Sequence, residues 1–331
     1  MKSFLTIIKS DYLQRTRSYR FLITLCISLA IAYTFVPEPN ANYSTIRIAN
    51  YIGYYNSPWF GYVTAMMTSV FLSLIGFYLI NSGIKADIDT KTGEIIASTR
   101  ISNFTYLFSK VLSNFLVLCT IVFVVFLMSI LLFFLYNDGF PFELIQFIKP
   151  YAIITLPAMF FIAALGVAFE VLLGKYSTLQ NIGFFFLFSF LAFFPPKTET
   201  QFSFDVYGNK IVIHQLEKTV REITNSDEKT SLNVGYVLGN IKENKKINFT
   251  GVDFPISFIL SRFIWMLLGV GIIAAISPFF HRFNVTRKIT PTKQKIKIES
   301  KHPLKEIVLS NLPKPQIDYS IFLLFKAELL L

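Results

Sequence analysis

The sequence has little charge. Only 15% of its 331 residues are Asp, Glu, Lys or Arg, whereas 53% are hydrophobic and 17% aromatic. A globule of this size could not cover its surface with so few polar residues, which excludes an ordinary soluble enzyme. The two cysteines, Cys26 and Cys119, both lie in apolar runs, so a disulfide-stapled secreted module is excluded as well. The mean hydropathy of +0.53 instead predicts an integral membrane protein.

Motifs for catalysis and metal binding are also missing. The only Gly-Lys pair, Gly174-Lys175, lacks the upstream glycine of a G-x-x-x-x-G-K-[ST] nucleotide-binding loop. The sequence contains no H-E-x-x-H and no G-x-S-x-G. Its three histidines are far apart and stand without cysteines or carboxylates at ligand spacing. We therefore expect no enzymatic activity, no cofactor and no metal site in this chain.

Six apolar runs are candidates for membrane-spanning helices, which need about 20 mostly apolar residues. The runs are Phe21–Val36, Phe60–Ile80, Val111–Leu135, Tyr151–Leu173, Leu179–Phe194 and Ile256–Phe279. The first is followed by Pro37-Glu38-Pro39 rather than by a small-residue cleavage site, so we interpret it as an uncleaved anchor. The predicted fold class is an all-α polytopic membrane protein with six transmembrane helices.

The distribution of charge predicts the orientation. Residues 1–20, 81–110, 174–178 and 280–331 together hold 20 Lys and Arg against 8 acids, and residues 37–59, 136–150 and 195–255 hold 10 against 11. The positive side is expected to be cytoplasmic, which puts both ends of this chain inside. The net charge of +11 then reflects topology, and we expect no nucleic-acid partner. The Lys, Asn, Ile and Phe usage suggests the cytoplasmic (inner) membrane of a bacterium.

Four segments outside the spans have patterns of their own. Residues 1–20 predict an amphipathic helix at the interface, with its apolar face towards lipid, although a basic flank that only sets topology would look the same. The external insertion 195–255 suggests a small α+β cap, with a hairpin over 202–213 followed by a helix carrying Leu216, Val220 and Ile223. Residues 280–318 suggest a basic linker. Residues 319–331 repeat the pattern of 3–13, which predicts the start of a second interfacial helix and membrane half.

The cytoplasmic connection between the second and third spans is the most informative segment. It covers residues 81–110, far more than a turn requires. Gly93 interrupts the chain, and Glu94–Thr99 is predicted to form a short helix with its acid in the first turn, where the helix dipole favours it. Ser102 can then cap the helix that leads into the third span. A short helix held crosswise below the membrane suits docking of a soluble partner.

This segment resembles the ABC type 2 permease family, the membrane subunits of one class of ATP-driven exporters. In that family an acidic stretch after the second span leads to a Gly–Glu/Thr helix, a Thr-Pro-[ILV]-Ser-like turn and a lysine opening the third span. The matching residues here are Asp87, Asp89, Gly93, Glu94, Ile95, Ile96, Thr99, Arg100, Ser102 and Lys110. Arg100 stands where proline is usual. The resemblance covers roughly residues 1–280, but the 195–255 cap and the linker lie outside what it explains.

The resemblance implies a permease that forms a translocation path and couples to a separate ATPase through these residues. The partner subunit would bind ATP and Mg, and a second permease half would come from another copy or from the continuation of the same chain. The other expected contacts are membrane lipids. The aromatic-rich spans would suit export of lipid, drug, ion or polypeptide equally.

Two other functions remain open from the residues alone. One is a membrane-anchored sensor that binds a ligand with its 195–255 cap. The other is a proton-coupled carrier, although the centres of the six runs carry no charge, which counts against it. Glu170 and Arg262 are the ionisable residues inside the runs, each near one end. Each is a candidate functional group or a satisfied group at a helix end.

Overall fold

The computed structural model describes residues 2–174, 176–193, 199–224, 232–239 and 244–280. This part of the chain is mostly helical. Four of its helical stretches are long and apolar enough to cross a membrane, which indicates a multi-pass membrane protein: Ser57–Asp89, Asn103–Tyr136, Leu144–Leu173 and Ile256–Phe279. The linker after residue 280 and the second interfacial helix predicted at 319–331 lie outside the described residues.

Two of the six predicted spans form shorter helices. Helix α2 (Tyr19–Tyr33) has 15 residues and α9 (Ser177–Phe193) has 17. At 1.5 Å per residue these helices are roughly 22 and 25 Å long, less than the ~30 Å hydrocarbon core. Four spans therefore have structural support, and six spans stay a prediction.

Local signals set the starts of the long helices. Asn56 caps α3 (Ser57–Ile80) by accepting the Trp59 N–H at 2.9 Å, and Pro58 stands in the first turn, where a missing N–H costs nothing. Ser102 caps α6 (Asn103–Tyr136) through the Thr105 N–H at 3.1 Å, as predicted. The third long stretch is α7 (Leu144–Pro150), one π-helical turn η1 (Tyr151–Thr155) and α8 (Leu156–Leu173).

Small residues and rings hold the bundle together. Helix α11 (Ile256–Ile276) crosses α8 where Gly269 faces Ala164, and a Cβ on that glycine would lie 3.2 Å from the alanine methyl. Such close approach supplies van der Waals contact where the surrounding lipid offers no hydrophobic driving force. Phe77 of α3 stacks on Phe184 of α9 with ring centroids 3.5 Å apart.

Helix α1 (Lys2–Thr16) precedes α2, as predicted for an N-terminal helix. Part of the face that we expected to meet lipid packs on α6 instead. Phe4 stacks with Phe108 at 6.2 Å between centroids, and the Tyr12 hydroxyl lies 2.9 Å from that of Thr120. The packing therefore fixes α1 to the bundle.

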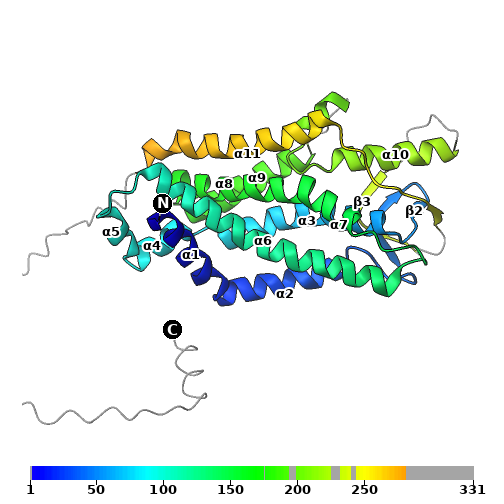
Figure 1. Cartoon of the computed structure of the whole chain (residues 1–331), viewed down its shortest axis with the longest axis horizontal. Helices are drawn as coiled ribbons and strands as arrows, with labels where there is room; N and C mark the ends of the chain where they lie inside the picture. The colour runs from blue at the N-terminus through cyan, green and yellow to red at the C-terminus, as the bar shows by residue number, and fades with distance from the viewer. Residues whose placement is uncertain (1, 175, 194–198, 225–231, 240–243, 281–331) are drawn as a thin grey trace, which may run out of the picture. The chain divides into compact units, whose positions relative to one another are not determined.

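A four-stranded sheet of order β3-β1-β2-β4 lies at one end of the bundle (Figure 1). Its strands are β1 (Tyr43–Ile48), β2 (Tyr51–Gly53), β3 (Leu232–Leu238) and β4 (Lys245–Ile247). β1 is antiparallel to β2 and β3, while β2 and β4 run parallel. The 195–255 insertion thus has α+β character, but it shares its sheet with the segment that follows α2.

The hairpin predicted over residues 202–213 is wrong. Glu199–Phe204 form the 3-10 turn η2, and α10 begins at Lys210 and ends at Thr224. The Asp205 carboxylate accepts the backbone N–H groups of Tyr207 (3.1 Å) and Lys210 (2.7 Å), which closes a turn ahead of a helix. The apolar residues from 211 onwards then serve one buried face of α10, including Leu216 and Val220 as predicted.

Candidate functional site

Lys110 of α6 lies at the centre of a buried ion cluster. Its Nζ is 2.7 Å from Asp11 Oδ1 of α1 and 2.8 Å from Asp87 Oδ2 of α4 (Gly83–Asp89). Lys110 is only 2% exposed, and both carboxylates are buried. Charges withdrawn from water this far are stable only when paired, so Lys110 fastens α1 and α4 to α6.

Arg15 continues the cluster on α1. Its Nε lies 3.2 Å from Asp11 Oδ2, and its Nη1 donates to the Ile80 carbonyl, the last of α3, at 3.1 Å. The guanidinium rests against Gly83, where any Cβ would collide with it. Burial acts to raise the pKa of Asp11, but the positive charges of Arg15 and Lys110 outweigh it and hold this pKa below its ordinary value.

Two further side chains hold α4 in place. The Tyr106 hydroxyl of α6 donates to Asp87 Oδ2 at 2.6 Å. Glu170 Oε1 of α8 accepts the backbone N–H groups of Ile84 and Lys85, both at 2.8 Å. The first turn of α4 therefore depends on a carboxylate from another helix. With Glu170 included, the cluster joins α1, α4, α6 and α8, and Arg15 links it to the end of α3.

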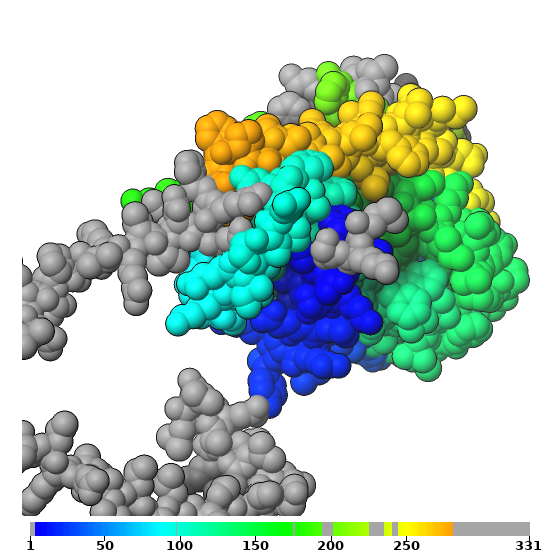
Figure 2. Space-filling view, turned by 60° about the vertical axis from the view of Figure 1, so that its left-hand side comes forward, coloured from blue at the N-terminus to red at the C-terminus, as the bar shows by residue number. Residues whose placement is uncertain are grey.

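Beyond this cluster the chain turns outward into α5 (Thr92–Ala97), which confirms a short helix with Glu94 in its first turn. Figure 1 places α1, α4 and α5 at the end of the bundle opposite the sheet, and Figure 2 shows α4 and α5 projecting there beside α1. Gly93 is buried and Ile96 half-buried, but Ile95 is 68% exposed. The remaining predicted coupling residues, Asp89, Glu94, Thr99, Arg100 and Ser102, are also exposed.

The ten predicted coupling residues thus divide into two groups. The structure brings Asp87 and Lys110 together in the cluster, while the others belong to α5, its flanks and the start of α6. No protein-family model, no curated protein and no solved structure matches this chain. The candidate site therefore stands on its own geometry.

Sequence reasoning missed Asp11, Arg15 and Tyr106. A signal for Asp11 was present, because it is the only acid among the first 36 residues and stands in an otherwise basic and apolar segment. Such an isolated acid is a candidate partner for a lysine that opens an apolar run, as Lys110 does. Tyr106 gave no comparable signal, since it looked like one of several aromatic residues leading into the span.

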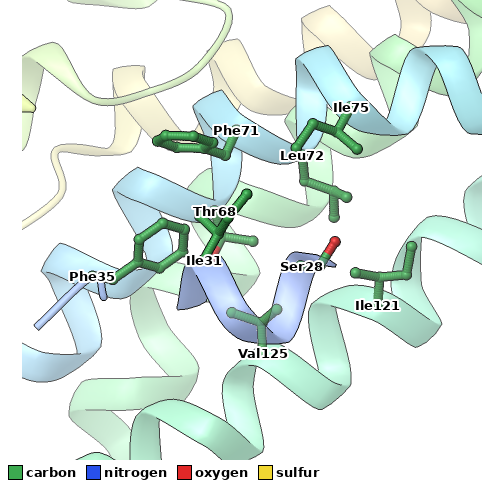
Figure 3. Close-up of a pocket in the computed structure, with 9 residues that line it drawn as sticks. All are labelled: Ser28, Ile31, Phe35, Thr68, Phe71, Leu72, Ile75, Ile121 and Val125. Carbon is green, nitrogen blue, oxygen red and sulfur yellow. The ribbon is translucent and has the colours of Figure 1, made fainter. Parts of the chain in front are cut away.

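An apolar pocket between α2, α3 and α6 is lined by Phe35, Phe71 and Ile121 among others, with Ser28 and Thr68 as its polar residues (Figure 3). It offers no charged group to a ligand. Within the described part of the chain, no three His, Cys, Asp or Glu side chains are grouped so that they could hold a metal ion.

Arg262, the second ionisable residue noted in the spans, lies on α11 and is 2% exposed. It does not join the cluster around Lys110. Its guanidinium donates to backbone carbonyls of the segment after η2, among them the Asp205 carbonyl at 2.7 Å. Arg262 is therefore a satisfied buried cation that holds a neighbouring segment of backbone.

Proposed function

We propose that this protein is the permease subunit of an ATP-driven exporter of the ABC type 2 class, and that α5 is the helix that docks on a separate ATPase. The observation that carries the proposal is the exposed Ile95 on a short helix whose base is anchored by the buried cluster. ATP and Mg would be bound by the ATPase, and a second permease half would complete the path.

The exposure of α5 supports a docking role. A six-residue helix is too short to be stable alone, so α5 depends on α4 and on Gly93 and Ile96 for its position. Presenting Ile95 to water brings no stability to the chain itself. A partner groove that buried this side chain would gain about 1.5–3 kcal/mol from it.

The cluster supports force transmission. A displacement of α5 acts first on α4. Helix α4 cannot move without straining the Asp87–Lys110 pair and the Glu170 hydrogen bonds. Those contacts lead into α6 and α8, two of the long apolar helices. Differential binding of ATP to two states of the ATPase would supply the free energy for the movement.

The expected setting is a bacterial cytoplasmic membrane, with α1, α4 and α5 on the cytoplasmic side. The excess of Lys and Arg in residues 1–20 and 81–110 supports this orientation, because basic loops stay inside. The sheet and α10 would then face outward.

The test is co-purification of the tagged full chain from its own membranes, followed by reconstitution with any Walker-A ATPase that mass spectrometry identifies. The chain should stimulate hydrolysis by the purified ATPase. Ile95→Asp should abolish both recovery and stimulation, since a carboxylate cannot enter an apolar groove without a large desolvation cost.

The matched control is Ile223→Asp, the same change at a 53% exposed isoleucine of α10. This variant should behave like the parent chain. Recovery of no ATPase, or equal stimulation by the parent and Ile95→Asp chains, would contradict the proposal. The 195–255 insertion, which contains α10, would then be the place to look for a sensor function.

A further inference from the structure

The turn formed by Ser203–Asn209, called the plug turn below, enters the helix bundle although the sequence placed it in the external insertion. The Asn209 side-chain amide donates to the Met66 carbonyl at 3.4 Å, and its Oδ1 accepts the Ser69 hydroxyl at 3.0 Å. Ser69 lies midway along the apolar run Phe60–Ile80. The plug turn therefore reaches about half of the depth of α3.

The opposite side of the plug turn is held by α11. Arg262 Nη1 donates to the Asp205 carbonyl at 2.7 Å, and its Nη2 lies 3.4 Å from the Ser203 carbonyl. Trp265 Nε1 donates to the same Ser203 carbonyl at 2.9 Å. Residues 205–209 are all buried. Two spanning helices thus hold the plug turn between them.

Helix α9 packs against both α3 and the plug turn. Phe184 packs on Phe77 near the C-terminal end of α3. Phe188 packs on Tyr207 of the plug turn, with 5.6 Å between ring centroids. Helix α9 ends five residues later, at Phe193. From the plug turn the chain continues into α10, which lies towards the end of the bundle that carries the sheet (Figure 1).

Position 208 of the plug turn favours glycine, because its backbone conformation and its close neighbours leave little room for a Cβ. Its φ of +70° lies in the left-handed region, and a Cβ would lie 3.1 Å from Arg262 Nη1 and 3.3 Å from Ile154 Cγ2. An alanine would therefore strain the backbone and press on α11 and on the π-helical turn η1 at once.

Irregular backbone is tolerated at membrane depth only where protein buries it or where it borders a water-filled cavity. The hydrogen bonds that hold the plug turn to α3 and α11 come from a hydroxyl, an amide, an indole and a guanidinium. Water can replace each of them. Ser69, which contacts the plug turn, and Ser73, one turn further along α3, are buried hydroxyls that also donate to carbonyls of their own helix. A removable closure needs contacts that water can replace when the closure withdraws. The plug turn has such contacts and lies next to buried hydroxyls.

We propose that the plug turn closes a path for water-soluble solutes through the bundle, and that its withdrawal from Ser69 and Arg262 opens this path. The closure does not depend on an ATPase, so its test is separate from that of the proposed function. Small hydrophilic ions and dyes serve as probes.

The experiment measures efflux of potassium and of carboxyfluorescein from liposomes that contain the full-length chain. Gly208→Ala should raise the efflux rate about tenfold, because ~1.4 kcal/mol of strain in the closed state shifts the closed–open ratio by that factor. Gly271→Ala is the matched control, since a Cβ there meets nothing within 4 Å. It should leave efflux at the level of the parent chain.

A second variant covers the case in which Gly208→Ala does not fold. Ser69→Cys and Asn209→Cys are combined with Cys26→Ala and Cys119→Ala, and a short bifunctional thiol reagent joins the two new cysteines. Efflux should be raised before cross-linking and should return to the parent rate after it. Equal efflux before and after cross-linking would overturn the proposal. A folded Gly208→Ala chain with the same efflux rate as Gly271→Ala, whether low or high, would overturn it as well.

Discussion

Replacing Lys110 by methionine tests the buried cluster most directly. Methionine keeps the length of the side chain but removes the charge that lies 2.7 Å from Asp11 and 2.8 Å from Asp87. Asp11 keeps Arg15 at 3.2 Å, whereas Asp87 keeps the hydrogen bond from the uncharged Tyr106 hydroxyl. Removing one partner of a buried ion pair costs about 3–5 kcal/mol, because the other charge is left uncompensated. We expect a loss of that size in the free energy of unfolding.

The assay is reversible unfolding in detergent micelles, or steric trapping in bicelles. Asp87→Asn, introduced into the Lys110→Met chain, should restore about 1–3 kcal/mol, since it removes the stranded carboxylate and keeps an acceptor for Tyr106. Lys149→Met is the control. Its Nζ pairs at 3.7 Å with a fully exposed Asp253, and the Val252 carbonyl to which it donates at 2.7 Å also accepts the Tyr62 hydroxyl at 3.2 Å. Its replacement leaves no buried charge or carbonyl uncompensated, so the loss should be much smaller. A loss below about 1 kcal/mol for Lys110→Met, or no recovery with Asp87→Asn, would refute the assignment of the cluster as a buried, paired network.

Three further predictions concern other features of the structure. The lowered pKa of Asp11 stabilises the folded state above the ordinary value of 3.8, and this stabilisation is lost as the pH falls through the lower folded-state value. The free energy of unfolding, measured against pH, should therefore fall more steeply in acid for the parent chain than for Asp11→Asn. Ser102→Ala should cost about 0.5–2 kcal/mol in a stability assay as the lost cap of α6, whereas Ser98→Ala, at an exposed hydroxyl that bonds its own turn, should cost less. Asn56→Ala should cost about 1–3 kcal/mol by the same assay, because it removes the cap of α3 and leaves the buried Phe249 carbonyl without its donor at 2.9 Å.

Local features of the fold could be predicted from the sequence. Ser102 was identified as a helix cap and α5 as a short helix, because capping and dipole effects act within four residues and are visible in any short window. The long apolar helices follow from hydropathy in the same way. Boundaries were less accurate: the predicted helix Glu94–Thr99 is observed two residues earlier, at Thr92–Ala97.

The site itself depends on contacts that no short window contains. Asp11 and Lys110 are 99 residues apart, and nothing in either neighbourhood specifies the other. The predicted hairpin failed for a related reason. The alternation of Phe202, Phe204 and Val206 resembled a strand, but Asp205 satisfied the local N–H groups and started a helix. The plug turn escaped notice because hydropathy equates burial with apolar residues, whereas Asn209 is buried through its hydrogen bonds.

Helix α3 connects the two polar regions of the bundle. At its C-terminal end the Ile80 carbonyl accepts a hydrogen bond from Arg15 of the ion cluster. Midway along α3, the Ser69 hydroxyl donates to Asn209 of the plug turn. These contacts lie eleven positions apart, which corresponds to roughly 16 Å of helix. Most of α3 is buried, so it cannot bend freely between its neighbours. A displacement of α4 that disturbs Arg15 therefore acts on the same rigid element that anchors the plug turn, and a shared rigid element is the physical requirement for coupling two distant sites.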